Sequence, residues 1–274
     1  MDTTFAIGGD MKVHRLGFGA MRLTGPPASP ERETALTVAR RAVELGVTLV
    51  DTADSYDLGA NEELVAEALR PYRDGVVVAT KGGQVNLGRE WIPLGRPEYL
   101  RQQAELSLRR LKVDRIDLYQ LHRVDPEVPL ADQIGALRRL RDEGKVRHVG
   151  LSEVTVEQLV EASRIMPIAS VQNRYNLTDR ASEPVLEHCE RHGIAFLPWL
   201  PVAPLSRGSD TSGDAVSRVA ARLGATRTQV ALAWLLHRSP VVLPIPGTSR
   251  LAHLEENVAA AGITLDPADL DELE

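Results

Sequence analysis

Four ionisable side chains follow apolar runs of the sequence at comparable positions. Asp51 ends the run VTLVD and Tyr56 follows five residues later, Lys81 ends GVVVATK, and His122 ends RIDLYQLH. Short apolar runs of this kind are typical of buried strands. We therefore expect three successive strands to present these four groups at the same end of one sheet.

A phenol, an ammonium, a carboxylate and an imidazole in one place can act as a tuned proton donor. The ordinary pKa of a tyrosine is about 10, and a nearby ammonium lowers it because the positive charge favours the phenolate. Asp51 would keep Lys81 charged and in place, and His122 would hydrogen-bond the substrate oxygen. The set is therefore suited to protonating the oxyanion that forms from a carbonyl group.

Each of these residues also has an ordinary structural explanation. Asp51 could cap the following turn, and Tyr56 could be a half-buried aromatic with a satisfied hydroxyl group. Lys81 could be a solvated strand end, and His122 could face a backbone carbonyl. The coincidence of all four at one end of the sheet is what favours a catalytic site.

The elements that must position these residues alternate along the chain. From residue 16 onward, apolar strands alternate with amphipathic helices, and capping boxes at Thr155/Gln158 and Thr226/Gln229 each begin a helix. The expected strands cover 16–20, 47–51, 75–80, 115–121, 146–151, 168–172, 194–198 and 241–246. The first expected helix is capped by Ser29, begins at Pro30 and ends at Gly46. The next helices are expected over 62–69, 97–111 and 129–143, then from Thr155 onward, over 182–192 and from Thr226 to 236. Ser249 is expected to cap a helix over 250–260, and Asp266-Pro267 to begin a short last helix.

Eight strand–helix units in one domain spanning residues 1–274 predict a closed (β/α)₈ TIM barrel of parallel strands. Residues 4–16, with the turn Gly8-Gly9-Asp10, predict an amino-terminal β-hairpin that caps the sheet. An open doubly wound sheet is the alternative, but its glycine fingerprint is incomplete because Arg22 stands at the third glycine position. The long loops 82–96 and 200–214 are expected at the face that carries the chemistry.

Composition narrows the class of protein. The 274 residues are 43% hydrophobic and 26% charged with a net charge of −6, which provides a core but no basic footprint for nucleic acid. Cys189 is the single cysteine, and we see no targeting or membrane-spanning segment, so a soluble cytoplasmic protein is expected. His188 and His192 have metal-binding spacing but no third ligand, so no metal is expected. The oligomeric state stays open.

Motifs along nearly the whole chain resemble the aldo-keto reductase family, in the family's order. They are LGFGAMRL, DTADSY, ATKGG, DLYQLH, KVRHVGLSEVT, VQNRYN, LPWLP and IPGTSRLAHLEEN. The resemblance implies a catalytic tetrad at Asp51, Tyr56, Lys81 and His122. In it Tyr56 is the general acid, Lys81 and Asp51 tune it, and His122 orients the carbonyl.

The resemblance also implies NADPH as the cofactor, lying across the barrel mouth. Ser152 and Gln172 would hold the nicotinamide carboxamide, Trp199 would stack on its ring, Arg250 would grip the 2′-phosphate and Asn257 would meet the adenine. Glu153 stands where the family often has asparagine. The other residues assigned to the cofactor are Gly19, Ala20, Met21, Asp51, Pro201, Gly247, Thr248, Ser249, His253 and Glu256, of which Gly247 and His253 replace a lysine and an arginine of many relatives.

The substrate is expected to be a small carbonyl compound contacted by Arg22, Trp91 and Arg123. LGFGAMRLTGP and LHRVDP look most similar to the bacterial pyridoxal reductase branch, which suggests a pyridoxal-like aldehyde; sugar or antibiotic keto-intermediates are equally open. Two other functions remain possible from sequence: a Schiff-base lyase that uses Lys81, and a catalytically silent module that binds NADP(H).

Overall fold

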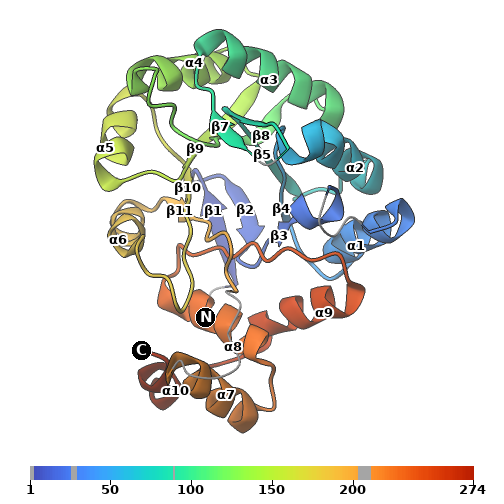
Figure 1. Cartoon of the computed structure of the whole chain (residues 1–274), viewed down its shortest axis with the longest axis vertical. Helices are drawn as coiled ribbons and strands as arrows, with labels where there is room; N and C mark the ends of the chain where they lie inside the picture. Colours follow the sequence, from blue (N-terminus) through green and yellow to red (C-terminus); the bar gives the residue numbers. More distant parts are fainter. Residues whose placement is uncertain (1–2, 26–29, 89, 203–210) are drawn as a thin grey trace.

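A curled sheet of seven parallel strands forms the centre of the molecule (Figure 1). The computed structural model describes residues 3–25, 30–88, 90–202 and 211–274. In sheet order the strands are β11 (Ala195–Phe196), β10 (Ser170–Gln172), β9 (Val146–Ser152), β8 (Ile116–Leu121), β5 (Val77–Gly82), β4 (Leu49–Asp51) and β3 (Phe18–Gly19). Each neighbouring pair is parallel, so all carboxyl ends lie at one face of the sheet.

Residues 241–246 close the sheet into a barrel. On one side Leu243 donates its amide to Phe196 of β11 at 2.8 Å, and on the other Gly17 and Gly19 donate to the carbonyls of Pro244 and Pro246 at 2.9 and 3.2 Å. The segment was expected to be a regular eighth strand, and it is not one. Pro244 and Pro246 have no amide hydrogen, so only part of a hydrogen-bond ladder forms. The barrel expected from the alternating pattern is nevertheless present.

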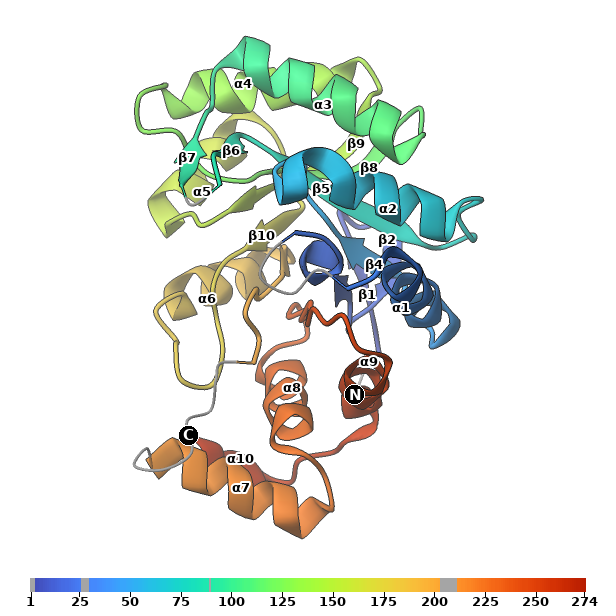
Figure 2. The same cartoon turned by 45° about the vertical axis from the view of Figure 1, so that its right-hand side comes forward.

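The outer layer consists of helices that follow the strands (Figures 1 and 2). They are α1 (Arg32–Glu44), α2 (Ala60–Leu69), α3 (Pro97–Leu111), α4 (Leu130–Asp142), α5 (Val156–Ile165), α6 (Glu183–His192), α8 (Arg227–Arg238) and α9 (Leu251–Ala259). Their apolar faces pack on the strands; Leu36 and Ala39 of α1, for example, join Val50 of β4 in one buried cluster. Both expected capping boxes are confirmed. No helix in the described part of the chain combines the length and apolarity needed to cross a bilayer.

The expected hairpin closes the end of the barrel where the strands begin. It consists of β1 (Thr4–Ile7) and β2 (Met11–His14), paired antiparallel. Ile7, Met11 and Val13 are buried with inward-facing residues of the strands, and the His14 amide donates to Thr48 just before β4 at 2.7 Å. Gly8 has φ +64, and a Cβ there would collide with the His148 ring, so the turn requires glycine. The hairpin therefore leaves the opposite end of the barrel, at the carboxyl ends of the strands, open for a functional site.

Two helix starts differ from expectation. α1 begins at Arg32 rather than Pro30, with Glu31 as the preceding residue, and the proposed cap Ser29 lies outside the described residues. The cap assigned to Ser249 is wrong by one position, because Arg250 is the residue before α9 and no side chain caps that helix. Thr248 instead accepts a hydrogen bond from the Arg250 amide at 3.1 Å, which forms the turn that leads into the helix.

Four further elements occupy the regions outside the repeating units. The loop 82–96 contains a hairpin, β6 (Gln84–Asn86) and β7 (Trp91–Pro93), that stands at the barrel mouth. Of the expected loop 200–214, residues 203–210 lie outside the described residues, and 211–214 already belong to the unexpected helix α7 (Thr211–Leu223). The expected last helix is α10 (Pro267–Leu273), and it packs against α7. Short 3₁₀ turns complete the set: η1 (Ala20–Leu23), η2 (Tyr56–Gly59) and η3 (Ala260–Gly262).

Candidate active site

The four residues of the proposed tetrad meet at the carboxyl ends of β4, β5 and β8. The Lys81 ammonium donates to Asp51 Oδ2 at 2.6 Å, to the Thr52 carbonyl at 2.7 Å and to Tyr56 Oη at 3.2 Å. The rings of Tyr56 and His122 lie 5.7 Å apart in an edge-on arrangement. Lys81 is fully buried beneath the other three, so its charge reaches the phenol without intervening water.

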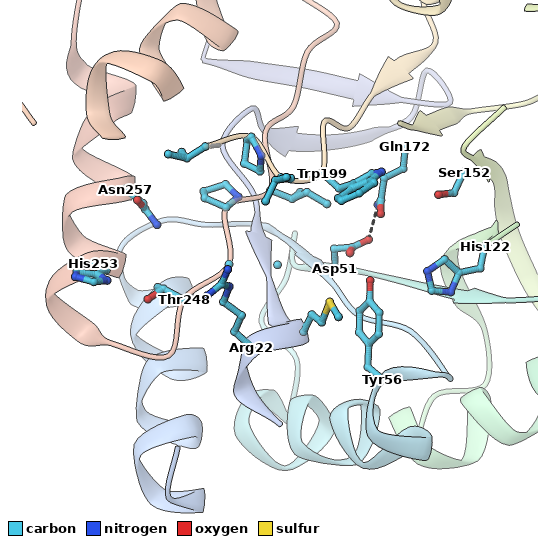
Figure 3. A pocket seen from close by; sticks show the side chains of 18 of the residues that line it. Arg22, Asp51, Tyr56, His122, Ser152, Gln172, Trp199, Thr248, His253 and Asn257 are labelled. Carbon is cyan, nitrogen blue, oxygen red and sulfur yellow. Dashed lines mark hydrogen bonds between the residues drawn. The ribbon is translucent and has the colours of Figure 1, made fainter. Parts of the chain in front are cut away.

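Two glutamines on other strands of the barrel hold the Asp51 carboxylate. Gln172 of β10 donates to Asp51 Oδ1 at 2.9 Å (Figure 3), and Gln120 of β8 donates to the same oxygen at 3.3 Å. Gln120 was missed in the sequence, although it lies two residues before His122 in one strand and therefore faces the same way. With one oxygen held by amides and the other by Lys81, the carboxylate is fixed in orientation.

The pKa values of the buried pair follow from their surroundings. Burial alone would lower the pKa of Lys81, but Asp51 and Tyr56 raise it above its ordinary value, so the amine stays charged. Burial raises the pKa of the Tyr56 phenol by more than Lys81 lowers it. The net lowering expected from sequence is therefore wrong in this structure. Tyr56 is a neutral phenol at physiological pH, and Lys81 stands ready to stabilise the phenolate once the proton leaves.

His122 is neutral as well. Burial lowers its pKa well below the ordinary value, and the positive charges of Lys81 and Arg123 act in the same direction. Its Nδ1 lies 3.2 Å from the Ser55 hydroxyl group. When Ser55 donates to Nδ1, the neutral ring carries its proton on Nε2. The Nε2–H group can then donate a hydrogen bond to a ligand oxygen. Ser55 was not identified in the sequence, where nothing distinguishes it from other loop serines.

A cavity of about 590 Å³ extends from the tetrad towards α9. Figure 3 shows Tyr56, Asp51 and His122 at one end and Thr248, His253 and Asn257 at the other. All three expected substrate residues line it: Arg22, Trp91 and Arg123. The expected cofactor residues that line it are Gly19, Met21, Asp51, Ser152, Gln172, Trp199, Pro201, Gly247, Thr248, His253, Glu256 and Asn257.

Three of the expected cofactor residues do not line the cavity. Ala20 is fully buried in η1, where its carbonyl accepts from Asn61 at 2.9 Å. Ser249 is half-buried in the turn before α9, and Arg250, the expected phosphate ligand, is exposed. Gln84, Leu200 and Val202 also line the cavity, and they belong to the two long loops expected at this face. Thr228, Ile245 and Pro246 complete the lining, and the sequence did not single them out.

Glycines allow two main chains to meet at the cavity wall. A Cβ on Gly19 would come within 2.8 Å of the Ile245 carbonyl oxygen, and a Cβ on Gly247 would come equally close to the carbonyl oxygen of Gly19. Any side chain at either position would push apart the end of β3 and the closing segment 241–246.

Trp199 is held in the cavity wall by Glu153. The indole Nε1 donates to Glu153 Oε1 at 2.6 Å, and the same oxygen accepts from the Arg174 amide at 2.7 Å. Glu153 has φ +55, a left-handed conformation that turns its side chain towards the tryptophan. Glu153 therefore holds an aromatic ring in place through a hydrogen bond.

The histidine pair on α6 belongs to the surface packing. The rings of His188 and His192 stack with centroids 4.1 Å apart. No group of three or more histidine, cysteine, aspartate or glutamate side chains arranged to hold a metal occurs within residues 3–25, 30–88, 90–202 and 211–274. Burial raises the pKa of Cys189 to about 12, so the thiol is protonated and packs as a small apolar group.

Asp54, two residues before Tyr56, should make stability depend on pH. Burial raises the pKa of its carboxyl group to about 8, with Glu62 acting in the same direction and Arg110 and Ser55 against it. The folded chain therefore keeps a proton that the unfolded chain loses near pH 4, so the free energy of unfolding falls as pH rises from about 4 to about 8. We expect Asp54→Asn to remove this fall. At about pH 8 the free energy of unfolding of the variant should then exceed that of the wild-type chain by about 1–3 kcal/mol.

Urea unfolding of both proteins at about pH 5 and about pH 8 checks this expectation. Equal losses of stability in the wild-type chain and in Asp54→Asn would assign the titration to another group.

Comparison with known proteins agrees with this combination of barrel and site. The model of the aldo/keto reductase family matches residues 15–274. The chain is 50% identical to an uncharacterised oxidoreductase of Schizosaccharomyces pombe over 96% of this chain and 88% of the relative, and 39% identical to pyridoxine 4-dehydrogenase of Escherichia coli over 99% and 97%. A Klebsiella pneumoniae aldo/keto reductase crystallised with NADP and acetate superposes with a TM-score of 0.83 at 30% identity, covering 100% of this chain and 94% of the other.

A closed barrel with a buried lysine–aspartate pair at its mouth defines the class of protein. The chain belongs to the aldo/keto reductase family and is an NADP-dependent oxidoreductase.

Proposed function

We propose that the protein reduces an aldehyde or ketone to an alcohol with NADPH, using Tyr56 as the proton donor. The observation that carries the proposal is the contact of the buried Lys81 ammonium with both Asp51 and Tyr56 Oη, at 2.6 and 3.2 Å, on the wall of the large cavity. A neutral phenol beside a fixed positive charge can release a proton to an oxygen that becomes negative.

The cavity has the lining that a dinucleotide needs. Its lining includes the apolar residues Met21, Trp199 and Pro201, and the end beside α9 carries the polar side chains of Thr248 and Asn257. We assign the nicotinamide to the end beside the tetrad, near Ser152 and Gln172, and the adenosine to the end beside α9. Thr248 and His253, which line the cavity, are then the first candidates to contact a 2′-phosphate, ahead of Arg250, which does not line it.

When bound, the reduced nicotinamide supplies a hydride to the carbonyl carbon. Tyr56 gives its hydroxyl proton to the carbonyl oxygen, which completes the alcohol and leaves a phenolate. Lys81 stabilises that phenolate across 3.2 Å, and Asp51 keeps Lys81 charged. His122 donates a hydrogen bond to the carbonyl oxygen and aligns it with Tyr56.

Pyridoxal is the first substrate that we propose to test. Pyridoxine 4-dehydrogenase of E. coli aligns over nearly the whole of this chain at 39% identity. The ring centroid of Trp91 lies 6.3 Å from the ring centroids of both Tyr56 and His122, in edge-on arrangements, so an aromatic wall stands beside the reacting groups. A flat aromatic aldehyde suits such a wall.

The structural environment of Lys81 disfavours a Schiff-base reaction. The amine is fully buried, donates to three oxygens and has a pKa above the ordinary value. A nucleophilic amine must instead be neutral and reachable.

A panel of aldehydes and ketones that includes pyridoxal tests the proposal. We expect oxidation of NADPH, followed by its absorbance, to be faster than oxidation of NADH with at least one member of the panel. Absence of turnover across the panel, combined with tight NADPH binding, would favour the catalytically silent module instead.

Glu153 should matter for cofactor affinity through Trp199. In Glu153→Ala the indole loses the acceptor at 2.6 Å, so we expect the Kd for NADPH to rise about three- to thirtyfold. Glu153→Gln keeps an oxygen acceptor and should stay close to wild type. Quenching of tryptophan fluorescence by NADPH measures both constants. Equal affinities in the alanine and glutamine variants would mean that the hydrogen bond does not position the ring.

A further inference from the structure

Arg123 is a cation on the cavity wall whose partners are neutral. It follows His122 at the carboxyl end of β8, and its Nη1 donates to the His122 carbonyl at 2.7 Å and to Ser152 Oγ at 3.1 Å. No carboxylate lies within ion-pair distance of it in the described part of the chain. Arg110, by contrast, is paired with the buried carboxylate of Glu62 at 2.5 Å. Arg123 therefore has no ion pair within the described residues.

The charge of Arg123 reaches the reacting groups. Burial lowers the pKa of the guanidinium, while Glu153 and Tyr56 act in the opposite direction. Arg123 in turn favours the ionised form of Tyr56 and the neutral form of His122. A partly desolvated cation without a direct ion pair is costly in a protein. A negative group on a bound ligand would supply the missing charge beside the carbonyl position.

Neither carboxylate that lines the described cavity is placed to pair with Arg123. Of the two carboxylates that line the cavity within the described residues, Asp51 is paired with Lys81, and Glu256 lies at the adenosine end, where it accepts from Thr226 at 2.6 Å. Arg22 is a second guanidinium in the lining, and Figure 3 shows it on the side of Thr248. The end of the cavity beside the tetrad is therefore positive as well as aromatic.

We propose that Arg123 forms an anion subsite that selects carbonyl compounds carrying a carboxylate or phosphate group near the reacting carbon. The geometry suits it, because Nη1 is already used and the edge formed by Nε and Nη2 makes no hydrogen bond within the described residues. That edge presents two parallel N–H groups, which match the two oxygens of a carboxylate or phosphate. The proposal rests on the proposed carbonyl reductase function and names its substrate class.

A matched pair of aldehydes tests the subsite. para-Carboxybenzaldehyde and its methyl ester share a ring and a reacting group but differ in charge. With saturating NADPH we expect wild-type kcat/KM to favour the acid, and Arg123→Met to reduce that preference about 10- to 100-fold. Arg123→Lys keeps the positive charge but loses the paired N–H groups of the guanidinium. Its preference for the acid should lie between those of the wild-type chain and Arg123→Met. Arg164→Met, the same change at an exposed residue in the last turn of α5, should keep the wild-type preference.

Two further arms separate the possible outcomes. Pyridoxal compared with its phosphate ester shows whether phosphate is accepted in place of carboxylate. Binding of benzoate, followed by tryptophan fluorescence in the presence of NADP, should weaken at least about tenfold in Arg123→Met. If no aldehyde is reduced but benzoate binds through Arg123, the proposed function fails and the subsite stands. An unchanged acid-to-ester preference in Arg123→Met, with both aldehydes reduced, overturns the subsite alone.

Discussion

Tyr56→Phe is expected to lower kcat for carbonyl reduction by about 10²- to 10⁴-fold. The change removes one oxygen, the only group on this residue that can give a proton to the substrate. The ring remains, with its edge contacts to Trp91 and His122, so the cavity should keep its shape. We therefore expect the Kd for NADPH to change by less than about threefold, because the loss falls on the chemical step rather than on binding.

Single-turnover kinetics and fluorescence titration measure the two quantities separately. Tyr72→Phe is the matched control, since it removes a hydroxyl that donates to the Leu111 carbonyl at 2.9 Å, on the outside of the barrel. It should cost about 1 kcal/mol of stability and leave turnover intact. If Tyr56→Phe turns over as fast as Tyr72→Phe, another group supplies the proton.

The sequence predicted the barrel because each local pattern agreed with the same fold. Alternating apolar runs and amphipathic helices placed Asp51, Lys81 and His122 at the ends of neighbouring parallel strands, and the structure brings them together. Segment 241–246 was predicted as a strand and is irregular for reasons that both lie in its sequence. Its apolar run reads as a strand, but two prolines leave it with few amides to donate.

Details that depend on three-dimensional contacts were out of reach of pattern reasoning. The Glu153 side chain turns to Trp199, 46 residues away in the sequence. The pKa of Tyr56 depends on a balance between burial and the charge of Lys81, and burial cannot be measured from a motif. Arg250 was expected to bind a phosphate because it is a planar cation at the start of a helix, and the structure leaves it exposed and outside the cavity lining. Local signals locate the site; packing decides what each side chain faces.

Lys81→Met should abolish activity and also destabilise the fold. The Asp51 carboxylate, 4% exposed, would keep its hydrogen bonds from Gln172 and Gln120 but lose its only counter-charge within the described residues. Removing one partner of a buried ion pair costs about 3–5 kcal/mol. Turnover should fall by about 10²-fold or more, because the phenolate would lose the ammonium 3.2 Å from its oxygen. Urea unfolding and steady-state kinetics measure the two losses.

The double variant Lys81→Met/Asp51→Asn separates the structural from the catalytic effect. It removes both charges together, so the uncompensated carboxylate disappears, and an asparagine can still accept from Gln172. We expect it to recover about half or more of the lost stability. Activity should stay low, because the phenolate would still lack a cation within 3.2 Å. Recovery of turnover along with stability would show that Lys81 acts only by holding the fold, and that the acidity of Tyr56 comes from elsewhere in the site.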